Sequence, residues 1–239
     1  MNILVAYYTR TGSTGRLAAA IAAELKSRGH AVAMDRLAVV KQQSKWTLLI
    51  RQIHQYPLVG LALLSKSFRR WWQKRYFQPE DDLLPPAFPD VSEFHHVCIG
   101  GPKWAYTAYP VARYLNQIKG LKNQNVSAFA TFGGPPLKVM ELDLIFTPMG
   151  DQIHHAGGRM ACTLGLSSNF HELPLIWIFR LLSWLFFRRP IASFTSESDY
   201  GKQKIREFCD GVEASGAGTQ PQAFAASVEA SYKHHERPR

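Results

Sequence analysis

The sequence predicts an α/β fold in which a parallel sheet is covered by helices on both faces. Two observations indicate it. Short apolar runs of strand type alternate with stretches of helical spacing, and turns rich in glycine or hydroxyl residues follow several of the apolar runs. Of the 239 residues, 46% are hydrophobic and 12% aromatic, so the chain can bury a core, and a disordered protein is excluded.

Five strands and four helices are expected in alternation. The strands are expected at 3–8, 30–37, 94–99, 126–131 and 159–164. The helices are expected at 16–28, 109–118, 137–149 and 200–212. The first helix illustrates the reasoning, because Leu17, Ala20, Ile21 and Leu25 recur at helical spacing and Gly29 follows as a helix-ending glycine.

The net charge of +10 is concentrated in two segments. Residues 41–78 contain eight basic and no acidic residues, and residues 169–194 carry a net +2, so the rest of the chain sums to zero. The same two segments contain five of the six tryptophans. We therefore expect one domain over 1–215 with two helical, basic, aromatic insertions at about 41–90 and 169–194, and a flexible polar tail at 216–239.

The cysteines and histidines do not form metal-binding patterns. The three cysteines stand alone, which favours neither a disulfide framework nor a zinc or iron–sulfur site. Six of the nine histidines form adjacent pairs, at 95–96, 154–155 and 234–235, and adjacent side chains in a strand point to opposite faces. No metal is therefore expected, and a reducing, cytoplasmic setting fits best.

A hydroxyl-rich loop lies between the first strand and the first helix, with the sequence Thr9-Arg10-Thr11-Gly12-Ser13-Thr14. Hydroxyl groups and backbone N–H groups converge there on a helix N-terminus, which favours a phosphate. The nucleoside-triphosphate loop requires a lysine after its glycine, and none follows here. The G-x-G-x-x-G pattern of dinucleotide-binding turns is also absent. The alternative is an ordinary β–α turn capped by threonine or serine.

In this order the residues resemble the phosphate loop of the flavodoxin family, which has the form T/S-x-T-G-x-T. The resemblance extends over most of the chain outside the insertions. It implies a doubly wound, five-stranded parallel sheet in the order 2-1-3-4-5, with the loops after the first and third strands meeting where the winding reverses. It also implies FMN as the cofactor, held at its phosphate by the loop 9–14.

Two further loops resemble the flavin-binding loops of this family. The first is Gly100-Gly101-Pro102-Lys103-Trp104-Ala105-Tyr106-Thr107, in which the resemblance implies that Trp104, and second Tyr106, stack on the flavin ring. The second is Thr131-Phe132-Gly133-Gly134, whose glycines would let the backbone approach the flavin. The alternatives are an ordinary surface or core role for the aromatic residues and a simple strand end for the glycine pair.

The insertions favour docking at a membrane surface. Residues 173–187 are almost all apolar, but fifteen helical residues span only about 22 Å, short of the roughly 30 Å hydrocarbon layer. An interfacial helix on an anionic membrane fits better than a spanning one. An extra helical layer on the domain or a homodimer interface is the alternative, and nucleic-acid binding is less favoured because no reader fold is recognisable.

Two looser resemblances bear on the insertions. Residues 167–170 resemble a segment of flavodoxin domains fused to ferredoxins, and the position of the long basic, aromatic insertion is similar to that in menaquinone-dependent protoporphyrinogen oxidases. We therefore expect an FMN-binding oxidoreductase or electron-transfer protein, peripheral on the inner membrane face. Its electron donor would be NAD(P)H or a reductase, and its acceptor a quinone or another lipophilic molecule. The alternative is a membrane- or partner-docking module with a redox-inactive flavodoxin-like core.

Overall fold

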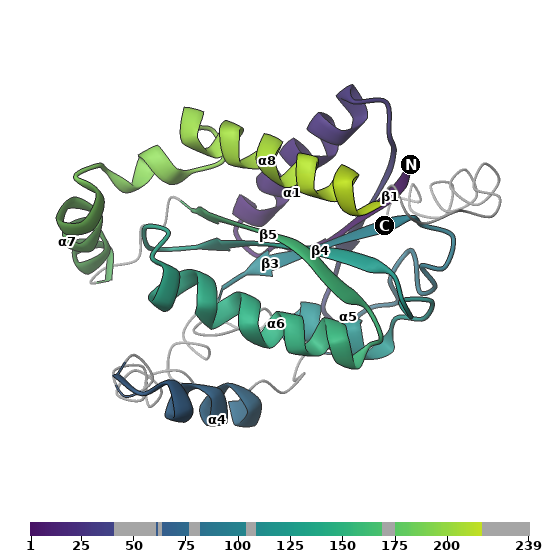
Figure 1. The fold of residues 1–239 in the computed structure, drawn as a ribbon, viewed down its shortest axis with the longest axis horizontal. Helices are drawn as coiled ribbons and strands as arrows, with labels where there is room; N and C mark the ends of the chain where they lie inside the picture. Colours follow the sequence, from purple (N-terminus) through teal and green to yellow (C-terminus); the bar gives the residue numbers. More distant parts are fainter. Residues whose placement is uncertain (41–60, 62–63, 77–81, 104–108, 169–174, 217–239) are drawn as a thin grey trace.

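The computed structural model describes residues 1–40, 61, 64–76, 82–103, 109–168 and 175–216 (Figure 1). Its centre is a five-stranded parallel sheet in the order β2-β1-β3-β4-β5. The strands are β1 (Asn2–Tyr8), β2 (Ala31–Leu37), β3 (His96–Pro102), β4 (Asn125–Phe132) and β5 (Arg159–Ser167). This is the order that the resemblance to flavodoxins implies, so the predicted fold class is confirmed.

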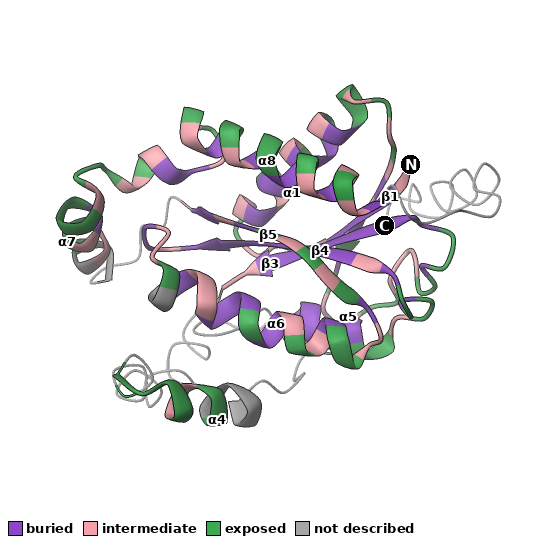
Figure 2. Cartoon of the chain, in the orientation of Figure 1, coloured by how far each residue is buried: buried purple, intermediate pink, exposed green. Residues whose placement is uncertain are grey.

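Helices cover both faces of the sheet, with α1 (Ser13–Ser27) and α8 (Asp199–Gly216) on one face and α5 (Tyr109–Gln117) and α6 (Asp143–His155) on the other (Figure 1). The strands alternate their side chains between two buried clusters, because successive residues of a strand point to opposite faces. In β1, Ile3 and Val5 pack with α1 and α8, whereas Leu4 and Ala6 belong to the opposite cluster. Figure 2 shows the resulting buried sheet between half-exposed helices.

The predicted elements are present, but several differ at their ends. α1 begins three residues earlier than expected, β3 lies at 96–102 in place of 94–99, and α6 continues to His155 in place of 149. The first turn of the helix expected at 137–149 is a π-helix, η1 (Lys138–Leu142), and α6 follows it directly. The fifth strand runs three residues further than expected, to Ser167, where it pairs with Phe132 of β4. The helix expected at 200–212 continues to Gly216 as α8. The tail expected from 216 onward lies outside the described residues beyond that glycine.

The two insertions contribute the remaining helices among the described residues. The first contains α4 (Lys66–Tyr76), which contacts α6, and its ends are joined where Val39 and Leu83 form an antiparallel bridge. The second contains α7 (Leu175–Phe187) and the 3-10 turn η2 (Ile191–Phe194), which leads into α8. Each insertion thus leaves the α/β core and returns to it without interrupting the sheet.

Charged side chains fix the C-terminal end of α1 to α8. Arg28 donates to Glu24, Asp210 and Glu213 over 2.6 to 3.0 Å, and His30 contacts the second oxygen of Glu213 at 2.7 Å. Gly29 ends the helix at φ +85°, a conformation that favours glycine, as predicted. The far end of α1 is therefore tied to α8, which leaves its N-terminal end at the opposite edge of the sheet.

A buried imidazole lies in the core beneath α8. His96 is fully buried, its Nε2 lies 2.8 Å from the hydroxyl of Ser127, and its Nδ1 lies 3.5 Å from the hydroxyl of Ser215. Burial lowers the pKa of His96 from 6.5 to about 4. The folded protein therefore holds a neutral imidazole at a pH where the unfolded chain takes up a proton.

Because of this group, the unfolding free energy should decrease as the pH is lowered. Between roughly pH 7.5 and roughly pH 5, protonation of His96 in the unfolded chain should remove about 2 kcal/mol of unfolding free energy. His96→Gln, whose amide keeps a partner for Ser127, should lose that much less over the same interval. Urea unfolding of both proteins at the two pH values measures the difference, and equal losses would contradict the assignment.

Candidate functional site

Three loops lie at the edge of the sheet where the parallel strands end. They follow β1, β3 and β4, and the register places Pro102 of β3 beside Thr131 of β4, and Thr131 beside Leu166 of β5. β1 lies between β2 and β3, so the winding of the chain reverses there. In doubly wound sheets the crevice at this reversal binds the ligand.

The loop after β1 presents the N-terminus of α1 without a side-chain cap. Gly12 is the N-cap residue at φ +88°, a left-handed conformation, and its N–H donates to the hydroxyl of Thr9 at 3.1 Å. No acidic residue lies in the first turn of α1. Thr11 is exposed and Ser13 is half-buried, so two hydroxyl-bearing residues and the helix N-terminus lie together at the surface. The loop is electrostatically suited to an anion.

The last threonine of the loop points into the protein. Thr14 is buried, and its hydroxyl lies 2.8 Å from that of Thr131 at the end of β4. This contact joins the first loop to the third. Thr14 therefore fixes the position of α1 against the sheet, and a further contact of its hydroxyl with a ligand stays a prediction.

A hollow lined with hydroxyl groups lies beside this threonine pair, between the ends of β4 and β5 and the start of α8. Its hydroxyl residues are Ser13, Thr131, Ser167, Ser168, Thr195 and Ser196. Arg16 and Glu197 also line it and form an exposed ion pair of 3.4 Å, while Arg16 donates to Ser13 at 3.3 Å. The hollow extends the polar surface from the loop after β1 toward β5.

The loop after β3 is described up to Lys103. The backbone N–H of Lys103 donates to the carbonyl of Thr131 at 2.7 Å, which holds the start of this loop against β4. Gly100 is required within β3, because a Cβ there would lie 2.3 Å from the ring of Phe129. The predicted flavin-stacking residues Trp104 and Tyr106, with Ala105 between them, lie outside the described residues, so their role stays a prediction.

The loop after β4 is held tightly by its neighbours. Phe132 is buried, Gly133 is half-buried and Gly134 is buried. The hydroxyl of Ser167 donates to the carbonyl of Gly134 at 2.6 Å. A Cβ on Gly134 would lie 2.6 Å from a carboxylate oxygen of Glu141 and 3.1 Å from the ring of Phe179 in α7. The packing against Glu141 and Phe179 therefore requires glycine at 134, and the close approach of this backbone to a flavin stays a prediction.

Sequence reasoning missed the acidic residue that meets both of the last two loops. Glu141, in the π-helix, accepts a hydrogen bond from Lys103 at 2.5 Å and another from the backbone N–H of Gly134. Burial raises the pKa of Glu141, whereas the charge of Lys103 and these two hydrogen bonds oppose the rise. The signal in the sequence was an acidic residue between Met140 and Leu142 in a helix expected to pack on the sheet.

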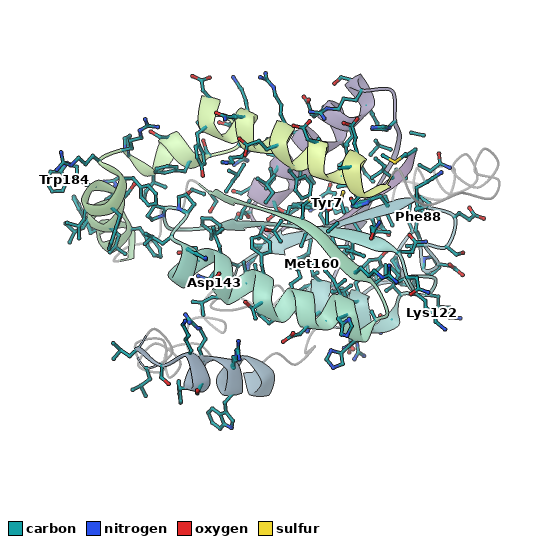
Figure 3. The ribbon with its side chains drawn as sticks, viewed as in Figure 1. Tyr7, Phe88, Lys122, Asp143, Met160 and Trp184 are labelled. Atoms are coloured by element: carbon teal, nitrogen blue, oxygen red, sulfur yellow. The ribbon has the colours of Figure 1, made fainter. Side chains whose placement is uncertain are left out.

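The second insertion exposes an apolar face beside the site. Trp177, Leu181, Trp184 and Leu185 are each at least 60% exposed, and their i, i+4, i+7, i+8 spacing puts them on one side of α7. Figure 3 shows Trp184 at the end of the molecule, projecting away from the sheet. Within the described part of the chain, no helix is both long and apolar enough to cross a bilayer.

The residues present fit a phosphate-bearing cofactor. The uncapped N-terminus of α1, the hydroxyls around it and the nearby guanidinium of Arg16 are donors or positive charge, which are the groups that hold a phosphate. The glycine-containing end of β3 and the loop after β4 lie next to it along the same edge. Together, fold and site define a doubly wound, flavodoxin-like α/β protein with an anion-binding type of loop at the reversal of winding.

Comparisons with known proteins extend only to solved structures, since no family model and no curated protein matches the chain. A flavoprotein from Lactobacillus acidophilus in complex with FMN is 18% identical, with a TM-score of 0.46 over 69% of this chain and 92% of its own. Flavodoxin 2 from Bacillus cereus is 11% identical, with a TM-score of 0.48 over 90% and 99%. At these identities and TM-scores the similarity concerns only the course of the backbone, and the fold assignment rests on the order of the strands in the sheet.

The packing around Gly134 can be tested with a matched pair of substitutions. Gly134→Ala should lower the unfolding free energy by about 1–3 kcal/mol, because the new methyl group must displace Glu141 and Phe179. Gly15→Ala, in the first turn of α1, meets its nearest atom at an ordinary 3.4 Å and should leave the protein unchanged or slightly more stable. Urea unfolding measures both, and equal stability of the two variants would contradict the packing described here.

Proposed function

We propose that the chain is an FMN-binding flavoprotein that acts as an oxidoreductase or electron carrier. One observation carries the proposal: the uncapped N-terminus of α1, with its Thr9-to-Thr14 loop, lies at the reversal of winding between β1 and β3. β3 and β4 end along the same edge, where a planar ring attached to that phosphate would reach. Bound FMN would supply the redox chemistry, and the protein its position and electrostatic surroundings.

The residues of the first loop would bind the phosphate. The N–H groups at the start of α1 and the hydroxyls of Thr11 and Ser13 are the donors, and the hydrogen bond from Gly12 to Thr9 holds the turn in shape. The contact between Thr14 and Thr131 would keep this loop at a constant distance from the loop after β4. A mononucleotide is favoured because the Rossmann glycine pattern is absent from this turn.

We further propose that the protein works at an anionic membrane surface. The exposed face of α7 combines two tryptophans and two leucines, and Arg180, Arg188 and Arg189 on or next to the same helix are all exposed. The guanidinium of Arg180 lies 5.4 Å from the ring of Trp177. Tryptophan and arginine together suit the headgroup region of an anionic bilayer, and the described part of α7 contains no acidic residue to oppose it.

The attachment of α7 supports a lipophilic acceptor. Phe179, on the inner side of this helix, packs toward Gly134 of the loop after β4. A helix docked on lipid would thereby hold the proposed flavin loops next to the bilayer, where a quinone or a similar lipophilic molecule is concentrated. NAD(P)H or a reductase would supply the electrons on the aqueous side.

FMN binding through the first loop makes a sharp prediction. The purified protein should bind FMN, and Thr11→Ala combined with Ser13→Ala should weaken FMN binding by about tenfold or more, because each lost hydrogen bond to a charged phosphate contributes roughly 1.5–3 kcal/mol. Riboflavin, which lacks the phosphate, should bind the variant and the wild type equally. Quenching of flavin fluorescence measures both affinities.

The control for this pair is Thr147→Ala, which removes an exposed threonine from α6, outside the site. It should leave both affinities unchanged. A wild-type protein that binds neither FMN nor riboflavin would refute the proposed function and favour a docking module with a redox-inactive core. An equal loss of riboflavin and FMN affinity in the double variant would instead refute the assignment of this loop to the phosphate.

Membrane docking is tested separately with vesicles. Trp177→Ser combined with Trp184→Ser should reduce binding to phosphatidylcholine–phosphatidylglycerol vesicles by about tenfold or more per tryptophan, because each buries a large apolar surface in the interface. Leu84→Ser, which removes an exposed apolar residue outside both α4 and α7, is the matched control and should bind like the wild type. Vesicle co-sedimentation at two salt concentrations measures the affinities.

Two results would contradict membrane docking. One is wild-type binding that does not differ between these vesicles and pure phosphatidylcholine, or no binding at all. The other is a stable dimer in sedimentation analysis that the two tryptophan substitutions dissociate, which would assign the α7 face to a second copy of the chain.

A further inference from the structure

An ion pair is buried between the loops after β3 and β4. The ammonium of Lys103 lies 2.5 Å from a carboxylate oxygen of Glu141, and the two side chains are only 10% and 6% exposed. Removing two charges from water is costly, and an apolar pair of similar volume often stabilises a fold as well or better. The pair is therefore poorly explained by stability alone.

The pair joins separate parts of the site. Lys103 is the first residue after β3, and its backbone is held to Thr131 of β4. Glu141 lies in the π-helix that follows the loop after β4, and it also accepts the N–H of Gly134 from that loop. Short π-helical turns within or next to α-helices are rare and frequently occur at functional sites. One carboxylate thus holds the ends of two loops together.

The same carboxylate also lies next to the second insertion. Glu141 and Phe179 of α7 are both within contact distance of the space above Gly134, where a Cβ would meet them at 2.6 and 3.1 Å. Ser167 holds the carbonyl of Gly134 from the β5 side at 2.6 Å. Glu141 is therefore the charged member of a packed junction between two strand ends, the loop after β4 and α7.

We infer that Glu141 is a positioning residue of the flavin site, which fixes Lys103 and its positive charge beside the loops that would hold the ring. The inference rests on the proposed function, because it assigns these two loops to the flavin. Together, the ion pair of Lys103 and Glu141 contributes no net charge at this edge of the sheet. Removing one partner should therefore change the field at the bound flavin, except where the remaining group itself becomes neutral.

The two single substitutions should shift the flavin midpoint potential differently. Glu141→Gln removes a negative charge and keeps the cation of Lys103, which favours the more negative reduced flavin, so the potential should rise. Lys103→Met leaves the carboxyl of Glu141, which either keeps its negative charge or takes up a proton, so the potential should fall or stay unchanged. A purely structural role would not separate the two variants in this way.

The affinities provide a second readout. Both variants should bind FMN at least tenfold more weakly than the wild type, and riboflavin should lose affinity by the same factor, because the junction lies away from the phosphate loop. This differs from the loss expected for the phosphate-loop variants, which is specific to FMN. Glu207→Gln is the matched control, since Lys204 and Glu207 form a pair of the same 2.5 Å length on the exposed surface of α8.

The experiment measures flavin affinity by fluorescence quenching and potential by dye-coupled reduction, with circular dichroism of the flavin-free proteins as a check of folding. Potentials of both variants that move in the same direction, or that equal the wild-type value, would overturn the inference. So would unchanged affinity for both flavins. If Glu141→Gln fails to fold, two other variants decide the question. Lys103→Met must lose affinity for both flavins without a rise in midpoint potential. The double variant, Glu141→Gln with Lys103→Met, must have a midpoint potential no higher than that of the wild type.

A wild-type protein that binds no flavin at all would refute the proposed function instead. In that case neither variant could bind flavin, and their thermal unfolding would report only on the ion pair. The failure of the inference and the failure of the proposed function are thus distinguishable from the wild-type measurement alone.

Discussion

The parallel pairing of β1 with both β2 and β3 is the constraint on which the candidate site depends. Because β1 lies inside the sheet, the helix after it and the helix after β3 must pass to opposite faces, and α1 and α5 do so. The segments that follow β1 and β3 therefore diverge at the ends of these strands, and the N-terminus of α1 points toward this edge of the sheet. No side chain caps it, so its positive dipole end is available to an anion.

The rest of the core holds this helix end in place. Apolar residues of α1 pack between the sheet and α8, Arg28 and His30 tie its far end to α8, and Thr14 joins its first turn to β4. The loop is thus anchored on rigid elements at both sides, although its own residues are polar and partly exposed. A binding loop on a rigid scaffold loses little conformational freedom when a ligand binds.

Most of the fold could be predicted from the sequence because its signals are local. The apolar run of β1, the helical spacing of Leu17, Ile21 and Leu25, and Gly29 at the helix end each specify their own element. The loop 9–14 is equally local, which is why its place at the start of α1 was predicted. The five-stranded order followed from the resemblance that this loop carries.

The parts that sequence reasoning missed depend on contacts between distant residues. Glu141 and Lys103 lie 38 positions apart, and nothing near either one in the sequence indicates that they pair. The same is true of Thr14 and Thr131, separated by 117 positions, so the inward direction of Thr14 could not be foreseen from a loop of alternating hydroxyls. The π-helical turn at 138–142 was expected as ordinary helix, because its Val139, Met140 and Leu142 are equally typical of both.

The charge distribution and the packing of α7 both indicate a surface that something else covers. An apolar helix that merely extended the core would bury its large side chains, yet Trp177, Trp184 and Leu185 are exposed while Phe179 and Ser183 face the protein. Basic residues surround that exposed face, whereas the core outside the two insertions is electrically balanced. A surface of this kind is costly in water unless something covers it. Phe179 of α7 packs toward Gly134, so the docking proposed for α7 would act on the same loop that Glu141 holds.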